Sequence, residues 1–281
     1  GTLNKKRDEL MEITIATTTT ANISDTSPLC VDEFDAEELA LQITYRTSKI
    51  YRSILPNEFL GQAWNKPNKL QVAPRLCQMI DDFNRISEWV THQIVTEVKL
   101  KDRAERLRKL AQICQHLRRM NNFQGVMEIL SGVNRACVRR LKKTWDEVGK
   151  ETQMIFEEME QLMSHSLSFK TYRQTLSKEE PPCVPYIGIY LTDLTFIEDG
   201  NPSLIDGGLI NFQKYEMVAR VLQEIKKFQT SYRIREIPKA QQAIEKSEAL
   251  SEEEAYKVSM RIEPRNPSEA IETLLIKDDQ Q

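Results

Sequence analysis

One segment limits the possible folds of this chain more than any other: an apolar stretch of helical length that lies between prolines. Residues 181–185 include three prolines, and each biases the residue before it away from helix. Residues 186–197 then carry apolar side chains on nearly every side, which indicates burial all round or contact with a partner. Gly200 and Pro202 end the helix. On composition alone, the simpler interpretation is a core helix whose acidic end meets solvent.

Amphipathic helices are predicted along most of the remaining chain. Asp35 is placed to cap a helix that runs to about Ile54, and Ser251 opens a second capped helix that ends near Pro264. Apolar residues also recur at helical spacing within residues 107–117, 155–166 and 217–228. Strand signals are scarce, and residues 231–237 are the best candidate for one short β-hairpin.

These patterns predict an all-α protein, with one large helical domain and a protruding helical hairpin. Residues 1–30 show no sustained period, and we expect a linker or weakly ordered arm there. Residues 31–270 form the predicted domain, with the hairpin at about residues 186–228, and residues 271–281 are a tail. The two helices of the hairpin are joined by a loop of about ten residues.

Composition excludes several classes of protein. A net charge of -3 argues against a nucleic-acid partner. No apolar run approaches the about 20 residues that a membrane span needs, so direct membrane insertion is not expected. The cysteines are odd in number and share no C-x-x-C spacing, which argues against a disulfide framework or a zinc site and favours a reducing, cytoplasmic location. They are Cys30, Cys77, Cys114, Cys137 and Cys183.

The common motifs of covalent and cofactor chemistry are missing from the sequence. It contains no phosphate-binding glycine loop and no nucleophile elbow. His92, His116 and His165 lie on separate predicted helices without the spacing of metal ligands. We therefore expect no cofactor and no metal site. A hydrolase assembled from distant residues stays an alternative that no motif favours.

Several longer motifs follow one another along the chain in a specific order. They are NNFQGVME at residues 121–128, Asn134, RLKKTW at 140–145, PPCVPYIGIYLTDLTFIEDGNP at 181–202, LINF at 209–212 and RIEPRNP at 261–267. In this order and spacing they resemble the catalytic domain of Ras-type guanine nucleotide exchange factors, the RasGEF family (Sos- and RasGRF-like). The resemblance extends from about Leu29 to Pro267.

This resemblance implies an all-helical exchange catalyst that performs no covalent chemistry. Such proteins hold a nucleotide-free G protein and speed the loss of its GDP. The hairpin wedges open the switch I side of the nucleotide site, and the main body grips switch II. The implied partner is a Ras-family small GTPase of the Ras, Rap or Ral type, bound most tightly without nucleotide. Recruitment to a membrane-bound GTPase is expected through regions outside this chain.

The resemblance also assigns roles to residues of the hairpin. Asp199 matches the acid that faces the P-loop, where it can pair with the P-loop lysine or the magnesium-binding hydroxyl. The best-studied members carry a glutamate there, which is one methylene longer, and Glu198 stands beside it to share the task. Thr195 matches the aliphatic position that excludes the metal ion, again with a departure. Asn201 is assigned to GTPase binding.

Four residues of the body are assigned in the same way. Asn134 matches the asparagine that faces switch II, and with Thr195, Glu198 and Asp199 it makes up the implied catalytic set. Met127 matches an apolar contact position and Phe169 an aromatic one, both implied to bind the GTPase. Asp81 occupies a place where some members carry a basic side chain, and it too is implied to bind the GTPase. That difference bears on which G protein is accepted.

Two alternatives from other classes stay open at this point. A non-catalytic module of the same fold would sequester a G protein without releasing its nucleotide, and the departures at Thr195 and Asp199 favour it. A helical scaffold unrelated to G proteins would form no such complex. The family often carries a second helical module that braces the hairpin, and residues 1–30 are too short for it.

Overall fold

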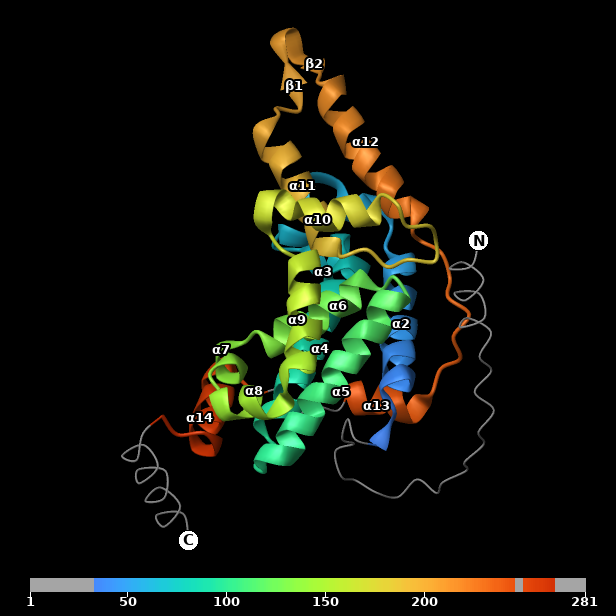
Figure 1. The fold of residues 1–281 in the computed structure, drawn as a ribbon. Coiled ribbons are helices and arrows are strands. Elements are labelled where there is room, and N and C mark those ends of the chain that lie inside the picture. Colours follow the sequence, from blue (N-terminus) through green and yellow to red (C-terminus); the bar gives the residue numbers. More distant parts are fainter. Residues whose placement is uncertain (1–32, 246–249, 266–281) are drawn as a thin grey trace.

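The computed structural model describes residues 33–245 and 250–265. The arm expected at residues 1–30, the tail expected at 271–281 and Cys30 lie outside these described residues. Within them the regular secondary structure is helical except for one two-stranded sheet, so the predicted all-α class is confirmed. Figure 1 shows a bundle of helices with a hairpin that projects from one end of it.

Five long helices make up the bundle, and α4 and α6 cross at its centre. The five are α2 (Ala36–Ser53), α4 (Pro74–Val95), α5 (Leu100–Arg119), α6 (Phe123–Val133) and α9 (Lys150–Leu162). Gly132 allows α4 and α6 to approach closely, because a Cβ there would lie 2.6 Å from Val90 Cβ and from Ser87 O. Trp89 is fully buried beside this crossing.

The remaining helices of the body cover the ends of the bundle. They are η2 (Pro56–Asn65), α3 (Lys69–Val72), α7 (Ala136–Arg139), α8 (Lys142–Val148), α10 (Ser166–Leu176), α13 (Pro238–Glu245) and α14 (Glu252–Ile262). The predicted caps are confirmed, since Asp35 accepts from Glu38 N and Ser251 forms a capping box with Glu254. The apolar stripe of α5 is fully buried as expected. The stripe at 155–166 is interrupted, because α9 ends at Leu162 and the exposed Ser166 begins α10.

The projecting hairpin consists of α11 (Ile187–Gly200) and α12 (Phe212–Lys227). Its connection contains β1 (Leu204–Ile205), the turn η3 (Asp206–Gly208) and β2 (Leu209–Ile210), paired antiparallel at the end of the projection (Figure 1). Gly207 and Gly208 adopt φ of 75° and 78°, which glycine accepts without steric cost. The expected helical hairpin is therefore confirmed.

The β-hairpin expected at residues 231–237 is wrong. That segment has no strand, and the side chain of Gln42 satisfies part of its backbone. Gln42 Nε2 donates to Arg235 O at 2.9 Å, and Ile237 N donates to Gln42 Oε1 at 2.9 Å. Because α2 supplies these partners, the segment needs no second strand.

Burial of the hairpin helix on all sides is also wrong. Ile187, Ile189, Tyr190 and Leu194 of α11 are buried, whereas Phe196 is 71% exposed. The first turns of α11 rest on the body, and the helix then runs outward beside α12 (Figure 1), with Asp199 near its end bonded to Gln62 of η2. The end of α11 therefore leaves apolar side chain in contact with solvent.

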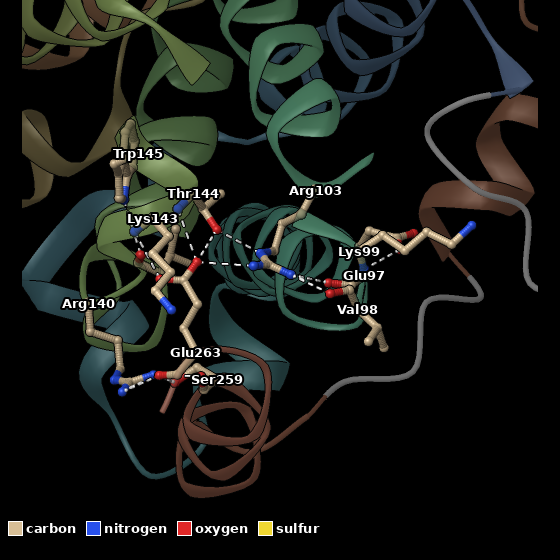
Figure 2. A network of polar contacts seen from close by, with 11 residues as sticks. Glu97, Val98, Lys99, Arg103, Arg140, Lys143, Thr144, Trp145, Ser259 and Glu263 are labelled. Carbon is tan, nitrogen blue, oxygen red and sulfur yellow. Dashed lines mark hydrogen bonds and ion pairs between the residues drawn. The ribbon is translucent and has the colours of Figure 1, made fainter. Parts of the chain in front are cut away.

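A buried polar network holds the far end of the body together (Figure 2). The Arg103 side chain of α5 is 1% exposed and uses all three of its nitrogens. Nε donates to Thr144 Oγ1 at 2.7 Å, and Nη1 donates to the carbonyls of Glu97 and Val98 at 2.7 and 2.9 Å. Nη2 donates to Glu263 Oε1 at 3.0 Å. These bonds offset the cost of removing the guanidinium charge from water.

Glu263 in turn connects the end of α14 to other parts of the body. Its carboxylate accepts from Lys143 N and Thr144 N, each at 3.0 Å, and so caps the start of α8. Its backbone carbonyl accepts from Arg140 Nη2 at 2.8 Å. Glu263, near the end of the described chain, thereby connects α14 to α5 and α8 and to the residue that follows α7.

Two expectations from composition concern thiols and membrane spans. Cys77, Cys114, Cys137 and Cys183 are buried free thiols, as small apolar residues would be. Over residues 33–245 and 250–265, no helix combines the length and apolar character that crossing a bilayer requires.

Candidate functional site

The proline-rich segment before α11 is joined to the corner between α5 and α6. Phe123 N donates to Val184 O at 2.9 Å, and Val184 N donates to Asn121 O at 3.0 Å. Asn121 adopts a φ of 56°, and Asn122 caps α6 by accepting from Gly125 N at 2.9 Å. Two motifs that are about 60 positions apart in the sequence thus meet in one contact, where their role is structural.

Side chains of the body fix the start of α11. Ile187 N donates to Gln124 Oε1 of α6 at 3.0 Å, and Tyr186 N donates to Tyr172 Oη of α10 at 2.8 Å. Gly188 leaves room for the Tyr186 ring, which a Cβ at that position would meet at 2.4 Å. These bonds satisfy amides that a helix leaves unpaired at its start. The base of the hairpin therefore has a defined position on α6 and α10.

Two tyrosines attach α12 to its neighbours. Tyr190 Oη of α11 donates to Glu224 Oε1 at 3.1 Å, and Tyr51 Oη of α2 donates to Ile225 O at 3.3 Å. Burial raises the pKa of both phenols, so both remain neutral hydrogen-bond donors. Both helices of the hairpin are thus held at the base.

The four hairpin residues singled out in the sequence lie in the last turns of α11 and at its C-cap, Asn201. Thr195 Oγ1 donates to Leu191 O at 2.8 Å, and Asn201 Nδ2 donates to Ile197 O at 3.0 Å. The two acids differ in their surroundings. Glu198 pairs with Lys214 Nζ of α12 at 2.6 Å, and the lysine side chain is only 3% exposed.

Asp199 is exposed and meets a different partner. Its Oδ1 accepts from Gln62 Nε2 of η2 at 2.8 Å, and Gln62 Oε1 accepts from Asn65 Nδ2 at 3.2 Å. Glu198 is therefore occupied by a buried cation within the hairpin, whereas Asp199 has a neutral partner at the surface. An exposed hydrogen bond of this kind exchanges readily with water.

The hairpin exposes many large apolar side chains. They are Phe196, Leu204, Ile205, Leu209, Ile210, Phe212 and Tyr215. Their exposure leaves apolar area in water that would be buried in an ordinary core. Large exposed apolar areas mark binding surfaces for other proteins or membranes.

On the body, Asn134 lies exposed at the end of α6. Its Oδ1 accepts from Arg139 Nε at 2.7 Å. Arg139 is itself paired with Glu160 of α9 and lies 4.6 Å from the centre of the Trp145 ring. Because the amide oxygen is used within the protein, the amide nitrogen is the group that can donate to a partner.

Phe169 lies in an uncommon backbone conformation at the start of α10. Leu167, Ser168 and Phe169 have φ of 50°, 56° and 61°, the left-handed region, which costs about 1–2 kcal/mol for each such residue. The Phe169 ring is 4.4 Å from the His165 ring and 6.0 Å from the Tyr186 ring, measured between centroids. Strain that the surrounding structure maintains is common at functional sites.

The two remaining body residues lie on the central helices. Met127 is half-buried on α6 against the core, and Asp81 is exposed on α4. Two residues after Asp81, Phe83 stacks at 6.1 Å from Tyr186, so α4, α10 and α11 meet in one aromatic group with Phe169. The structure thus joins Phe169 to the base of the hairpin, while Asn134 lies at the far end of α6.

Arg173 of α10 bridges the left-handed turn and the hairpin. Its Nη1 and Nη2 donate to the two carboxylate oxygens of Asp193 at 2.8 and 2.7 Å, and its Nε donates to Ser168 O at 2.9 Å. The hydrogen bonds to Asp193 raise the pKa of the guanidinium. Sequence reasoning missed Arg173, together with Gln62, Arg139 and Lys214. Each contacts a residue of another element, for which no short-range pattern exists.

A pair of buried acids lies behind α6. Glu128 is buried and accepts from Gln124 Nε2 at 3.3 Å, and burial, with the nearby Asp82 carboxylate, raises its pKa well above the usual value. Asp82 pairs with Arg46 of α2, and burial also raises the pKa of Asp82. Because Gln124 also caps α11, these acids are linked to the base of the hairpin.

Comparison with known proteins identifies similar sequences. The family model described as "RasGEF domain" matches residues 38–216. The chain is 40% identical to Ras-specific guanine nucleotide-releasing factor 2 of Danio rerio over 241 residues, which are 85% of this chain and 19% of that protein. It is 42% identical to Ras guanine nucleotide exchange factor K of Dictyostelium discoideum over 243 residues, 85% of this chain and 16% of that protein. The chain therefore spans about a fifth of the length of these relatives or less.

Proposed function

The chain belongs to the RasGEF domain family, and from this premise we propose that it releases GDP from a small GTPase of the Ras type. Membership of the family removes the alternative of an unrelated helical scaffold. The observation that carries the proposal is a hairpin that is fixed at its base, apolar along its exposed length and acidic at the end of α11. Part of it, α11 through Glu216, lies within the matched residues.

We propose that catalysis follows from competition between exchange factor and nucleotide for one G protein. The two ligands have mutually unfavourable coupling, so each weakens the binding of the other equally. A hairpin inserted on the switch I side displaces groups that hold the nucleotide, and the nucleotide-free complex is the tightest one. Incoming GTP then reverses the binding.

Asp199 is our candidate for the acid that faces the P-loop. Its bond to Gln62 is exposed and neutral, so a cation of the partner can replace it at little cost. Glu198 is the weaker candidate, since leaving Lys214 would strip a buried ammonium group of its counter-ion. Thr195 has its hydroxyl bonded to Leu191 O and therefore offers its methyl group for excluding the metal ion's water.

The body face is proposed to grip switch II. Asn134 donates from its amide nitrogen, Phe169 and Met127 supply apolar contacts, and Asn201 holds the end of α11. Asp81 contributes a negative charge that selects among the Ras, Rap and Ral types. We further propose a cytoplasmic location, in keeping with buried free thiols, and recruitment to the membrane-bound partner by regions outside this chain.

The test is release of fluorescent GDP from purified Ras, Rap and Ral proteins, with and without this chain. We expect acceleration for at least one of the three. Replacement Asp199→Ala should lower the maximal rate by about 10- to 150-fold while the complex still forms, because one charge-assisted contact is worth about 1.5–3 kcal/mol. The exposed Asp102→Ala on α5 is the matched control. No acceleration for any of the three proteins would contradict the proposal.

One alternative keeps a specific observation in its favour. Asp199 is shorter than the family's glutamate and is already hydrogen-bonded to Gln62. A module that only sequesters the GTPase, without exchange activity, would not need a longer or unbonded acid at this position. Such a module would bind nucleotide-free GTPase on a sizing column and leave the rate of GDP release unchanged. Replacement Asp199→Glu would then give activity that the natural chain lacks.

A further inference from the structure

Arg173 contacts both halves of the surface that the proposed function requires. It lies on α10, it donates to the backbone of the turn that carries Phe169, and it donates to Asp193 in the middle of α11. Within residues 33–245 and 250–265, the other bonds from the body to α11 lie near its two ends. They are the caps at Tyr186 and Ile187 and the exposed bond of Gln62 to Asp199, whereas the partners of Tyr190 and Glu198 belong to α12 of the hairpin itself.

The geometry of the Arg173–Asp193 contact makes it a directional one. Two parallel N–H···O bonds of 2.7 and 2.8 Å fix the plane of the guanidinium against the plane of the carboxylate. The two side chains are 37% and 30% exposed, so the pair is partly shielded from water. A bidentate pair of this kind restrains rotation of α11 more than a single bond would.

The third bond of Arg173 acts on the left-handed turn. Ser168 O accepts from Arg173 Nε at 2.9 Å, and Ser168 has a left-handed neighbour on each side. Such a conformation persists only where surrounding contacts maintain it. Since the same guanidinium is held by Asp193, the position of α11 determines where Arg173 holds the turn, and hence where Phe169 lies.

We propose that Arg173 is a positioning residue that couples the hairpin to the switch II contact at Phe169. Loss of the fork to Asp193 loosens the turn, and loss of the turn's carbonyl bond loosens α11. With both bonds intact, the hairpin and Phe169 are presented to the partner as one unit. This role rests on the proposed function for its biological meaning, whereas the coupling itself is a property of the isolated chain.

The first test measures the coupling without any G protein. Amide hydrogen exchange is followed in α10 and α11 of the whole chain for wild type, Arg173→Ala, Asp193→Asn and Arg173→Lys. Asp193→Asn alters only α11 directly and leaves the Arg173–Ser168 bond possible. We expect it to speed exchange in α10 as well as in α11. Faster exchange confined to α11 would overturn the proposal.

Two further variants calibrate this measurement. Arg220→Ala removes an exposed arginine of α12 that pairs with Glu216, and it should leave exchange in α10 at the wild-type rate. Arg173→Lys keeps the charge but not the planar fork, and partial recovery between alanine and wild type is expected. If Arg173→Lys and the wild type had equal rates of amide exchange in α10 and α11, the planar fork would not be needed, and the proposal would also be overturned.

The second test uses GDP release from whichever G protein responds to the wild type. Arg173→Ala should lower the rate at sub-saturating exchange factor by about 3- to 30-fold, the range of couplings measured along such networks. Adding Phe169→Ala to Arg173→Ala should cost less than Phe169→Ala costs alone, because the two act through one unit. Fully additive losses would overturn the coupling. If the wild type releases no GDP, the proposed function fails, and hydrogen exchange still decides the role of Arg173.

Discussion

The body and the hairpin of this molecule differ in which polar and apolar side chains are buried and which are exposed. In the body, charged groups such as Arg103 and Glu263 are buried and multiply bonded, and most large apolar side chains are covered, with isolated exceptions such as Val98. In the hairpin, the polar contacts at Asp199 and Asp193 are few and partly exposed, and large apolar side chains face solvent. A buried ion pair that loses one partner costs several kcal/mol, whereas an exposed pair contributes about 0–1 kcal/mol.

This difference separates stability from binding within one chain. Changes in the body's polar network should unfold the protein, and changes on the hairpin should alter recognition while the fold persists. The Arg173–Asp193 pair lies between the two cases, since it is half-shielded and connects both regions. The predictions below run from the largest expected effect to the smallest.

The largest effect is expected from breaking the Arg103–Glu263 pair. Glu263→Ala leaves a buried guanidinium without its counter-ion and removes the cap of α8, so the free energy of unfolding should fall by about 3–5 kcal/mol. Urea denaturation measures this loss. Lys257→Ala, which breaks only an exposed pair with Glu253, is the control and should change stability by less than about 0.5 kcal/mol. Equal losses in the two variants would remove the contrast between buried and exposed pairs.

The next largest effect should appear in exchange rather than in stability. Asn134→Ala removes the proposed amide donor to switch II, and the rate of GDP release should fall about 30-fold, as for a hot-spot contact of about 2 kcal/mol. Its urea midpoint should stay near that of the wild type, because Asn134 is exposed. Asn68→Ala on the exposed start of α3 is the matched control. If the rate of GDP release were unchanged in Asn134→Ala, Asn134 would not be the residue that contacts switch II.

The buried Glu128 gives a prediction about pH. Burial raises its pKa in the folded state, so its carboxyl stays protonated there above the pH at which the unfolded chain loses that proton. The associated stability is therefore fully present below the unfolded pKa of about 4.3 and declines as pH rises toward the folded pKa. Glu128→Gln should lessen this decline, so the variant gains on the wild type between pH 5 and pH 8. Urea midpoints at both values, with the exposed Glu157→Gln as control, check it.

The smallest effect on stability is expected at the end of the hairpin. Phe212 is 77% exposed, so Phe212→Ser removes little buried apolar area and should change the free energy of unfolding by less than about 0.5 kcal/mol. If the same variant weakens binding to the nucleotide-free partner on a sizing column, the exposed apolar side chains belong to the interface. A loss of more than 2 kcal/mol in urea denaturation would mean that the hairpin shares the body's core.

Local signals in the sequence predicted the elements well. The caps at Asp35 and Ser251 involve residues three positions apart, and the α5 stripe repeats within one helix. Such patterns depend on the chain's immediate neighbourhood, which the sequence contains in full. The same holds for the boundaries of α11, where Pro185 and Gly200 act on adjacent backbone.

Contacts between distant elements were not predictable in this way. The strand expected at residues 231–237 failed because Gln42, about 190 positions away, supplies the backbone partners. The bonds of Asp199 to Gln62 and of Arg173 to Asp193 depend on how helices pack, and helix periodicity does not determine that packing. The positions of the site residues along the chain came from a family resemblance, and their surroundings came from the structure.

The Arg103–Glu263 contact also has a consequence for the order in which the protein is completed during synthesis. The two residues are 160 positions apart, and the whole hairpin lies between them in the chain. A ribosome therefore produces both helices of the hairpin, and the residues that cap its base, before Glu263 emerges. Until then Arg103 has no counter-ion at its site, so the nascent chain presents its apolar hairpin on a body that is not yet closed. That interval is when a chaperone would have the most apolar surface to recognise.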